Sequence, residues 1–471
     1  MDTTALASYI EDYWDAHILP TLTEFIRIPC LSPSFDKEWK ANGHMHRAVK
    51  LVMEWMEAQG VEGLRLRVVE EGDRTPLILG EVPGTDPTSM PGTVLMYGHV
   101  DKQPEMVGWR EDLGPWKPVM DGEGRLYGRG GADDGYAAFA SIAAIRALQQ
   151  AGLPHPNIRL LIECSEESGS VHLPHYLQSQ GEALGDPGLV VCLDSGCGNY
   201  EQLWSTTSLR GIVGVTLKVE ILSAGVHSGM GGGIVPNPML VMRQLLDRLE
   251  DGETGRMLPP GLHVDIPPQR VEQAAKVAQV LGGSVSAAFP FVEGGRPLSD
   301  STQQLLLNNS WEPALAVIGQ DGLPPAGEGG NVLLPGLTFR LSVRIPPGLK
   351  VSDAVAALKG ALEPDPPFGA RVTVSAGGEP GWDAPPLAPW LEQVTDAASR
   401  EFYGREACYA GLGGSIPFMN MMGERFPNAQ FLITGVLGPH SNAHGPNEFL
   451  HVPYAKKLTC CIARVLQAGV G

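Results

Sequence analysis

The chain has 471 residues, of which 43% are hydrophobic, so it can form large globular cores and more than one domain is expected. Its formal net charge is −19 and it contains no basic run, which argues against binding to nucleic acid or to an anionic membrane surface. No signal-peptide pattern or bilayer-spanning apolar run is evident, and the seven cysteines lack the spacing of a disulfide framework, so a cytoplasmic protein with reduced thiols is expected.

The first 206 residues alternate between helix-like and strand-like segments. Helical spacing of apolar residues extends from about Leu6 to Ile28 and from Met45 to Gln59, and an Ala-rich helix is expected from Tyr136 to Gln150. Apolar runs typical of buried strands lie at 64–69, 77–80, 94–97, 157–162 and 189–193. This succession predicts an α/β domain built on a mostly parallel sheet.

Around residues 206–211 the pattern changes to long alternating strands with one exposed face. Such strands are expected at 211–221, 338–345 and 370–375, with helices at 238–249 and 352–362. They predict an inserted α+β domain over residues 207–379, although segment 252–330 receives no assignment and looks irregular.

The α/β domain is expected to resume after a return linker at Gly377–Gly381. A helix near Leu387–Phe402, a strand at Gln430–Thr434 and a helix at Tyr454–Leu466 are expected there. The predicted division is therefore 1–206, 207–379 and 380–471.

Acidic and histidine side chains follow the apolar runs of the α/β domain. His99 and Asp101 follow one strand, Glu166 and Glu167 another, and Asp194 a third. Ligands collect outside the carboxyl ends of the strands in such sheets, so we expect these side chains to converge. Converging carboxylates repel one another, and one or two divalent cations would neutralise them.

Each of these features also has a simpler structural interpretation when it is taken alone. A His-x-Asp pair at a strand end can be an ordinary hydrogen bond, and adjacent glutamates can form a solvated turn. Asp133-Asp134 can cap the helix that follows, or one of the two carboxylates can bridge two cations. Segment 439–448 carries two histidines, either of which can be a ligand or a polar loop residue.

The joint appearance of these features at strand ends favours a metal site over the simpler interpretations. Two histidines and three carboxylates suit a pair of cations such as zinc, manganese or cobalt. In hydrolases, two such ions stabilise both the attacking water and the carbonyl that is cleaved.

Several short motifs from residue 97 to residue 448 strengthen this interpretation: Tyr97–Asp101, Gly128–Asp134, Glu166–Gly169, Asp194, His227–Gly229, Gly413–Pro417 and Ala443–Glu448. Together they resemble the co-catalytic metallopeptidases that include aminoacylase, carboxypeptidase G and succinyl-diaminopimelate desuccinylase. The resemblance covers nearly the whole chain, and it is greatest for the carnosinase-like cytosolic dipeptidase branch. It implies a zinc-peptidase-type catalytic domain with an inserted lid through which a homodimer forms.

The resemblance also implies the metal ligands and the catalytic residues. Two divalent ions, zinc first and manganese or cobalt as alternatives, would be bound by His99, Asp133, Glu167, Asp194 and His444. The carboxylate of Asp133 would bridge the two ions. Glu166 would be the general base toward metal-bound water, and Asp101 would hold the imidazole ring of His99.

The implied substrate contacts lie in the lid and near the end of the chain. His227 would reach into the partner subunit's site and stabilise the oxyanion. Arg344 would bind the substrate carboxylate, with Asn331 and Ser415 as lesser contacts.

Two departures from the carnosinase branch bear on the substrate. Asp133–Tyr136 reads Asp-Asp-Gly-Tyr where that branch has Asp-Asp-Lys-Gly, and Gly-Pro-Asn-Glu follows His444 in place of Ser-Gln-Asn-Glu. Both departures weaken the case for carnosine itself and leave every implied ligand in place.

The leading prediction is a metallopeptidase that cleaves dipeptides or small peptides. An N-acyl-amino-acid deacylase or a carboxypeptidase on the same scaffold is the alternative. A non-catalytic peptide- or metal-binding protein is a third possibility, and the presence of Glu166 argues against it because binding alone does not need that carboxylate.

Overall fold

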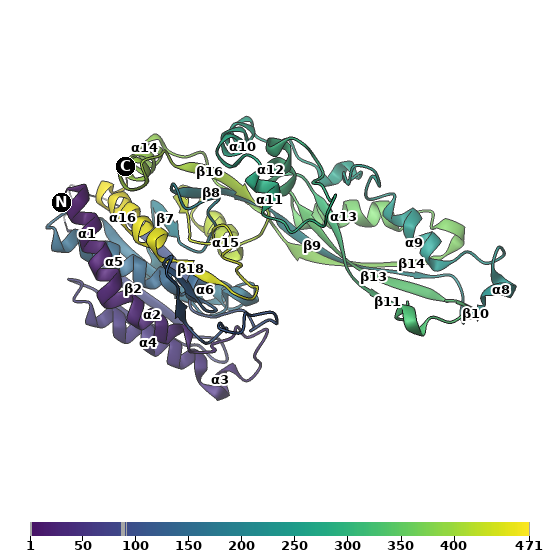
Figure 1. The fold of residues 1–471 in the computed structure, drawn as a ribbon, viewed down its shortest axis with the longest axis horizontal. Helices are drawn as coiled ribbons and strands as arrows, with labels where there is room; N and C mark the ends of the chain where they lie inside the picture. Colours follow the sequence, from purple (N-terminus) through teal and green to yellow (C-terminus); the bar gives the residue numbers. More distant parts are fainter. Residues whose placement is uncertain (1, 86–89, 91, 471) are drawn as a thin grey trace. The chain divides into compact units, whose positions relative to one another are not determined.

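The computed structural model describes residues 2–85, 90 and 92–470, which form two compact units (Figure 1). Unit 1 comprises Met1–Thr206, Ala384–Tyr409 and Pro417–Gly471, and unit 2 comprises Thr207–Asp383 and Ala410–Ile416. Unit 1 is therefore assembled from segments on both sides of a long insertion.

Unit 1 contains a six-stranded sheet of order β1-β2-β6-β3-β7-β17. Strands β6, β3, β7 and β17 run parallel to one another, whereas β1 and β2 pair antiparallel at one edge. The parallel strands β3 and β7 consist of apolar residues that are almost all buried, as expected for strands covered on both faces. The prediction of a mostly parallel α/β sheet is confirmed. The strands are β1 (Arg65–Val69), β2 (Leu77–Val82), β3 (Thr93–His99), β6 (Asn157–Glu163), β7 (Leu189–Cys192) and β17 (Gln430–Ile433).

Helix α5 (Tyr136–Gln150) lies at the centre of the helical layer of unit 1 and is buried along almost its whole length. It packs on β3 and against α1, α4 and α16, and its many alanines allow these close approaches. The other helices are α1 (Thr3–Tyr13), α2 (Leu19–Ile26), α3 (Trp39–Asn42), α4 (His44–Ala58), α6 (Leu173–Ser179), α7 (Gly181–Leu184), α14 (Pro389–Tyr403), α15 (Pro417–Arg425) and α16 (Val452–Ala468), with a π-helical turn at Trp14–Ile18.

A small antiparallel sheet of order β18-β5-β4 was not expected from the sequence. It comprises β4 (Val119–Met120), β5 (Arg125–Tyr127) and β18 (Phe449–His451). Phe449 pairs with Tyr127, so two chain segments more than three hundred residues apart lie side by side.

Unit 2 is built on a four-stranded antiparallel sheet of order β11-β13-β9-β14. Alternate residues of β9, such as Val213 and Val215, are fully buried against α9 and α13, which explains the alternating sequence pattern. The strands are β9 (Gly211–Glu220), β11 (Ala314–Asp321), β13 (Gly336–Ile345) and β14 (Arg371–Glu379). The helices are α8 (Ser228–Gly231), α9 (Pro238–Leu246), α10 (Pro268–Leu281), α11 (Ser284–Ala287), α12 (Thr302–Ser310) and α13 (Val351–Leu362).

Two shorter sets of strands complete the architecture. A two-stranded ribbon joins β10 (Val226–His227) to β12 (Val332–Leu333). A three-stranded sheet of order β15-β8-β16 consists of β8 (Trp204–Leu209), β15 (Trp382–Asp383) and β16 (Cys408–Leu412).

Two expectations about the insertion are wrong. Segment 252–330 is not irregular, because it contains α10, α12 and β11. The expected linker at Gly377–Gly381 belongs largely to β14, in which Gly378 pairs with Val213. A Cβ atom on Gly378 would lie 1.8 Å from the carbonyl oxygen of Ile212, so glycine is needed there for strand pairing rather than for flexibility.

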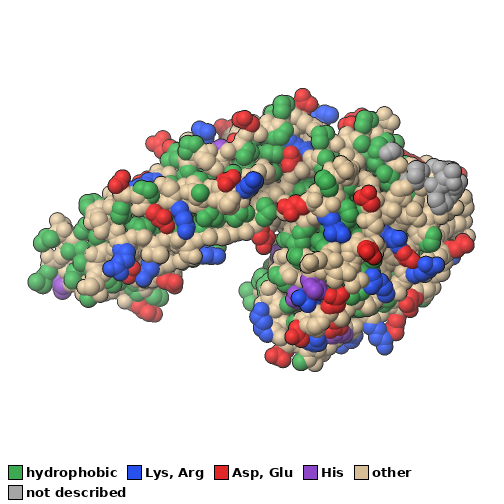
Figure 2. Space-filling view, turned by 180° about the vertical axis from the view of Figure 1, so that it is seen from behind, with side chains coloured by type: hydrophobic (Ala, Val, Ile, Leu, Met, Phe, Trp, Pro, Cys, Tyr) green, Lys and Arg blue, Asp and Glu red, His purple; other side chains and the backbone are tan. Residues whose placement is uncertain are grey.

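Surface charge and cysteine state agree with the composition. On the face in Figure 2, acidic and basic side chains of the described residues are interspersed. All seven cysteines are buried, and Cys30, Cys164, Cys192, Cys197, Cys460 and Cys461 are free thiols. No helix among residues 2–85 and 92–470 is long and apolar enough to span a membrane.

Candidate metal centre

The predicted metal ligands come from five separate segments of unit 1. His99 is the last residue of β3, and Asp194 lies two residues beyond β7. Glu167 lies in a short 3-10 turn after β6, and Asp133 lies in the turn that leads into α5. His444 lies in the loop before β18. His99, Glu167 and Asp194 therefore lie at the carboxyl ends of the parallel strands β3, β6 and β7, as expected for this sheet type, and Asp133 and His444 come from loops.

The carboxylate of Asp133 lies between two histidines. Its Oδ1 is 3.4 Å from Nε2 of His99, and its Oδ2 is 3.1 Å from Nε2 of His444. Nε2 of His99 also lies 3.7 Å from Oδ2 of Asp194, and Nε2 of His444 lies 3.3 Å from Oε2 of Glu167. The five side chains therefore form two ligand groups that share one carboxylate.

Buried polar atoms in this cluster lack hydrogen-bond partners. Nε2 of His99, Oε1 of Glu167 and Oδ1 of Asp134 are buried in this way. Such atoms are rare in folded proteins, and three of them in one cluster of nitrogen and oxygen donors fit a divalent cation. Donor atoms of His99, Asp133 and Glu167 all lie within 4.8 Å of one another, as do those of His99, Asp134 and Asp194.

The orientation of the His99 ring suits a metal ligand. Its Nδ1 lies 3.0 Å from the backbone oxygen of Asp101. A carbonyl oxygen can only accept, so Nδ1 carries the hydrogen and the lone pair of the neutral ring is on Nε2.

The carboxyl groups of the cluster resist ionisation together. Burial raises the pKa of Asp134, Glu166, Glu167 and Asp194 above their ordinary values. The negative charge of Asp194 raises the pKa of Asp134 and that of Glu166 further. The negative charge of Asp133 does the same for Glu167. A divalent cation would oppose both effects, because it favours the charged carboxylates.

The two imidazoles respond in the opposite sense. Burial lowers the pKa of His99, but the negative charge of Asp194 and contacts with other carboxylates outweigh burial and raise it well above its usual value. Burial also lowers the pKa of His444, but its hydrogen bond to Asp133 together with the negative charges of Asp133 and Glu448 outweighs burial and raises it. For Asp133 itself, burial is outweighed by both histidines, so its pKa is lowered.

The carboxylate of Asp101 holds the turn that carries the two glutamates. It accepts hydrogen bonds from the backbone N–H groups of Glu166, at 3.2 Å, and Glu167, at 3.1 Å. Its Oδ1 lies 3.5 Å from Nδ1 of His99, farther than the Asp101 carbonyl. Gln103 donates to Oε2 of Glu167 at 2.6 Å.

Glu166 lies beside the ligand group that contains His99. Its Oε2 is 3.9 Å from Nε2 of His99, and its side chain is 12% exposed. The side chain of His444 is 55% exposed, so solvent reaches the cluster on that side. A carboxylate in this position can exchange protons with a water or a substrate that enters from solvent.

His227 and Asn331 lie together in unit 2. His227 is exposed at the end of β10, and its Nδ1 accepts a hydrogen bond from the backbone N–H of Gly229 at 3.1 Å. The next residue, Ser228, donates its N–H to the carbonyl oxygen of Asn331 at 2.9 Å. Both predicted side chains therefore belong to the β10–β12 ribbon.

Arg344 lies on β13, away from that ribbon in the chain, and is close enough to Arg210 for their charges to interact. Burial lowers the pKa of both guanidinium groups. The positive charge of Arg344 lowers the pKa of Arg210 further, to about 10. Neither arginine has an ion pair with any residue that the structure describes. Ser415 lies half-buried in the loop after β16.

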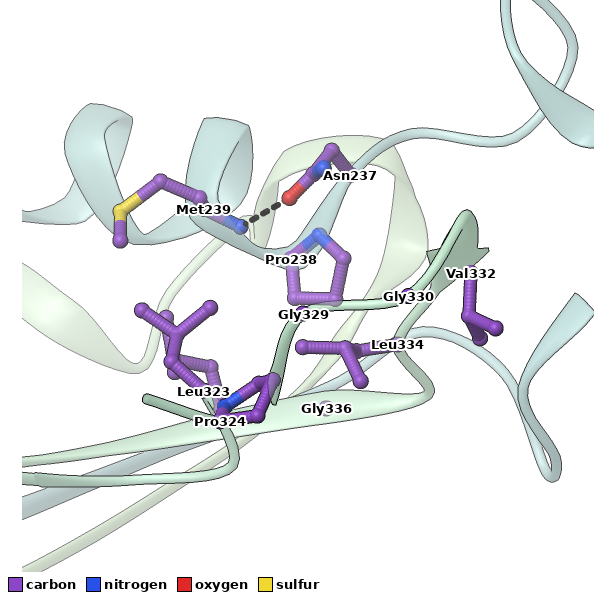
Figure 3. A pocket seen from close by; sticks show the side chains of 11 residues that line it. Asn237, Pro238, Met239, Leu323, Pro324, Gly329, Gly330, Val332, Leu334 and Gly336 are labelled. Atoms are coloured by element: carbon purple, nitrogen blue, oxygen red, sulfur yellow. Dashed lines mark hydrogen bonds between the residues drawn. The ribbon is translucent and has the colours of Figure 1, made fainter. Parts of the chain in front are cut away.

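Unit 2 also contains a cavity of about 300 Å³ near the start of α9 (Figure 3). Its walls are mainly aliphatic side chains and glycines, and the side chain of Asn237 accepts from the N–H of Met239. None of the predicted catalytic or ligand residues lines it.

The sequence did not predict roles for Gln103, Arg129 or Glu448, and of the pair Asp133-Asp134 it favoured Asp133 as the ligand. Arg129 and Glu448 lie within two of the motifs quoted above, but their contact joins positions 319 residues apart. No local pattern indicates such a pairing.

Comparison with known proteins shows the family to which the chain belongs. The model of peptidase family M20/M25/M40 matches residues 95–468. The chain is 27% identical over 424 residues to a cysteinylglycine-S-conjugate dipeptidase of Corynebacterium striatum, covering 87% of this chain and 88% of that protein. It is 28% identical over 405 residues to a human Beta-Ala-His dipeptidase, covering 81% and 76%.

Among solved structures, the dipeptidase Dug1p of Saccharomyces cerevisiae has the same fold. The TM-score is 0.76 at 23% identity, over 99% of this chain and 98% of that one. The resemblance expected from the sequence motifs is thus confirmed, and the chain belongs to the M20/M25/M40 family of peptidases.

Proposed function

We propose that this protein is a dinuclear metal-dependent peptidase that hydrolyses the amide bond of dipeptides or small peptides. The observation that carries the proposal is the carboxylate of Asp133 between Nε2 of His99 and Nε2 of His444. His99, Asp133 and Asp194 would bind one ion, and Asp133, Glu167 and His444 the other. Zinc is proposed first, with manganese or cobalt as alternatives, since the donors are nitrogen and oxygen. The ions would supply Lewis-acid polarisation and charge neutralisation.

The protein's own residues would move the protons and orient the substrate. Glu166 would take a proton from the attacking water and deliver it to the leaving amine. Its position beside His99 and its raised pKa support this role. His227 would donate a hydrogen bond to the oxyanion of the tetrahedral intermediate.

A free carboxylate is the proposed recognition feature of the substrate. Arg344 would bind it, and the neighbouring charge of Arg210 would strengthen the attraction. Asn331 and Ser415 would add polar contacts. The relatives named as dipeptidases support a dipeptide substrate.

An N-acyl-amino-acid deacylase or a carboxypeptidase is the second candidate, because its substrate also presents a carboxylate to Arg344. A panel of dipeptides with free and N-acylated amino groups separates the candidates. Faster hydrolysis of the free dipeptides supports the first, and faster hydrolysis of the N-acylated compounds supports the second.

The substitution Glu166→Gln tests the mechanism. It keeps the size of the side chain but removes the base, so kcat should fall by about 10²–10⁴-fold while the bound metal is retained. The matched control is Glu57→Gln, on the exposed face of α4, which should keep wild-type kcat. Unchanged turnover in the Glu166 variant would contradict the proposal. If the metal-loaded wild type cleaves no amide, a non-catalytic binding protein is the better description.

The proposal includes a homodimer formed through unit 2, in which His227 acts in the partner subunit's site. The exposed position of His227 on the β10–β12 ribbon supports this. Analytical ultracentrifugation with parallel assays tests it, and a fully active monomer would remove the role in trans. A reducing, cytoplasmic location is also proposed, because six of the seven cysteines are free and buried: Cys30, Cys164, Cys192, Cys197, Cys460 and Cys461.

A further inference from the structure

We propose that Arg129 and Glu448 are positioning residues for only one of the two metal sites, the site formed by Asp133, Glu167 and His444. The inference rests on the proposed function, because it presupposes two bound ions. Neither residue is a metal ligand. Their buried ion pair would hold the ligands of one site in place without affecting metal binding at the other.

Arg129 and Glu448 form an ion pair that is almost entirely removed from solvent, with side chains 1% and 0% exposed. Glu448 also accepts a hydrogen bond from the backbone N–H of Gly130 at 2.9 Å. A buried charge is stable only when it is paired and hydrogen-bonded, so the two segments that carry these residues are held together.

The same arginine connects the segments on either side of the proposed site. Its Nη2 donates to the carbonyl oxygen of Gly445, at 2.9 Å, and its Nε donates to that of Pro104, at 3.1 Å. Gly445 directly follows His444, and Arg129 precedes Asp133 by four residues. One guanidinium group therefore joins the loop that carries His444 to the turn that carries Asp133.

The loop that carries His444 needs such support, because its backbone is strained. His440, Asn442, His444 and Asn447 all have φ between 53° and 66°, in the left-handed region. Non-glycine residues keep this conformation only where the surrounding structure enforces it. Without the ion pair, the loop would relax and Nε2 of His444 would move away from Asp133.

The two ligands that belong only to the other site, His99 and Asp194, have a separate support, whereas Asp133 is common to both sites. His99 ends the central strand β3, and its ring is held by the carbonyl of Asp101. The hydroxyl of the fully buried Tyr136 donates to the carbonyl oxygen of Leu193, the residue before Asp194. Among the described residues, no hydrogen bond joins Arg129 or Glu448 to these groups.

The test measures the number of bound ions per chain. Metal-free Glu448→Gln protein is loaded with zinc, dialysed and analysed by mass spectrometry, with affinities from titration. We expect the wild type to retain two ions and the variant about one, with the weaker site losing about 10–100-fold in affinity. The double variant R129Q/E448Q removes both buried charges, so it leaves neither charge unpaired and should show the same loss.

Two further variants identify which site is lost. Adding His444→Ala to E448Q should change the ion count little, whereas adding Asp194→Asn should remove the remaining ion. Tyr136→Phe is the matched variant for the other site. It removes the hydrogen bond to the carbonyl of Leu193, so it should weaken the site that contains His99 and Asp194.

The outcomes separate this inference from the proposed function. Wild-type affinity at both sites in folded E448Q and R129Q/E448Q, shown by circular dichroism, would overturn the inference alone. Parallel loss of both ions from those folded variants would also overturn it, because the ion pair would then support the whole cluster. A wild type that binds no ion would overturn the proposed function, and the inference with it.

Discussion

At the scale of single residues, a backbone hydrogen bond fixes the orientation of the His99 ring. The carbonyl oxygen of Asp101, two residues later, takes the hydrogen of Nδ1 and leaves Nε2 facing the carboxylates. The same negative charges raise the pKa of the ring well above its usual value, although burial opposes them. In the metal-free protein, the carboxylates therefore favour the protonated ring, and a proton competes with a cation for Nε2.

This competition predicts the pH dependence of metal binding. Because the pKa of His99 and that of His444 are raised, both rings bind a proton more tightly than a free imidazole does in the metal-free protein, and a metal ion must displace that proton. Affinity should therefore fall as pH drops from 8 to 6, by about tenfold per pH unit for each displaced proton. Calorimetric titrations in buffers of different ionisation enthalpy measure the released protons. A binding enthalpy independent of the buffer would contradict the prediction.

At the scale of elements, the contact between β3 and α5 determines where the acidic turn lies. Gly98 of β3 lies under the start of α5, and a Cβ atom there would be 2.8 Å from Cβ of Ala137 and 2.9 Å from Oδ2 of Asp134. The strand and the helix can approach this closely only because residue 98 has no side chain. The packing of β3 against α5 therefore determines where the turn with Asp133 and Asp134 lies.

Gly98→Ala should therefore disturb both stability and metal binding. The added methyl group must displace the start of α5, at a cost of about 1–3 kcal/mol in the free energy of unfolding. The control is Gly122→Ala, where a Cβ atom meets nothing within 4 Å. Urea unfolding of the metal-free proteins measures the difference, and zinc titration measures the affinity. Equal stability and affinity of the two variants would show that the β3–α5 contact tolerates the methyl group.

Most elements of unit 1 were predictable, because their apolar spacing matches their burial. Helix α5, expected at 136–150, has those bounds in the structure. Helix α10 was missed, since its buried positions are Arg270, Ala274 and Val277, which give a weak hydrophobic pattern. The short strands β4, β5 and β18 were missed because two or three residues are too few to show an alternation of apolar and polar side chains.

At the scale of the whole molecule, all five predicted metal ligands belong to unit 1. Unit 2 has its own hydrophobic core, with residues such as Val343 and Leu358 fully buried. Metal binding should therefore stabilise one unit directly and leave the internal contacts of the other unchanged.

Calorimetric unfolding with and without a chelator tests this separation. At a zinc concentration one hundred times the dissociation constant, each of the two ions adds about 2.7 kcal/mol, so chelation should lower one transition by roughly 10–20 °C. A second transition, assigned to unit 2, should not move. Val343→Ala identifies that transition, because a cavity in the unit 2 core should lower its midpoint. Equal shifts of both transitions on chelation would contradict the prediction.

By itself, the sequence determined the fold class, the family and the candidate ligands, because buried strands, helices and short motifs are local patterns. Only the tertiary structure decided that Asp133 lies between two histidines and that Arg129 pairs with Glu448. It also decided the strand order and the extension of β14 through Gly378. These features depend on contacts between distant segments, and the energy of such contacts is not encoded in the spacing of neighbouring residues.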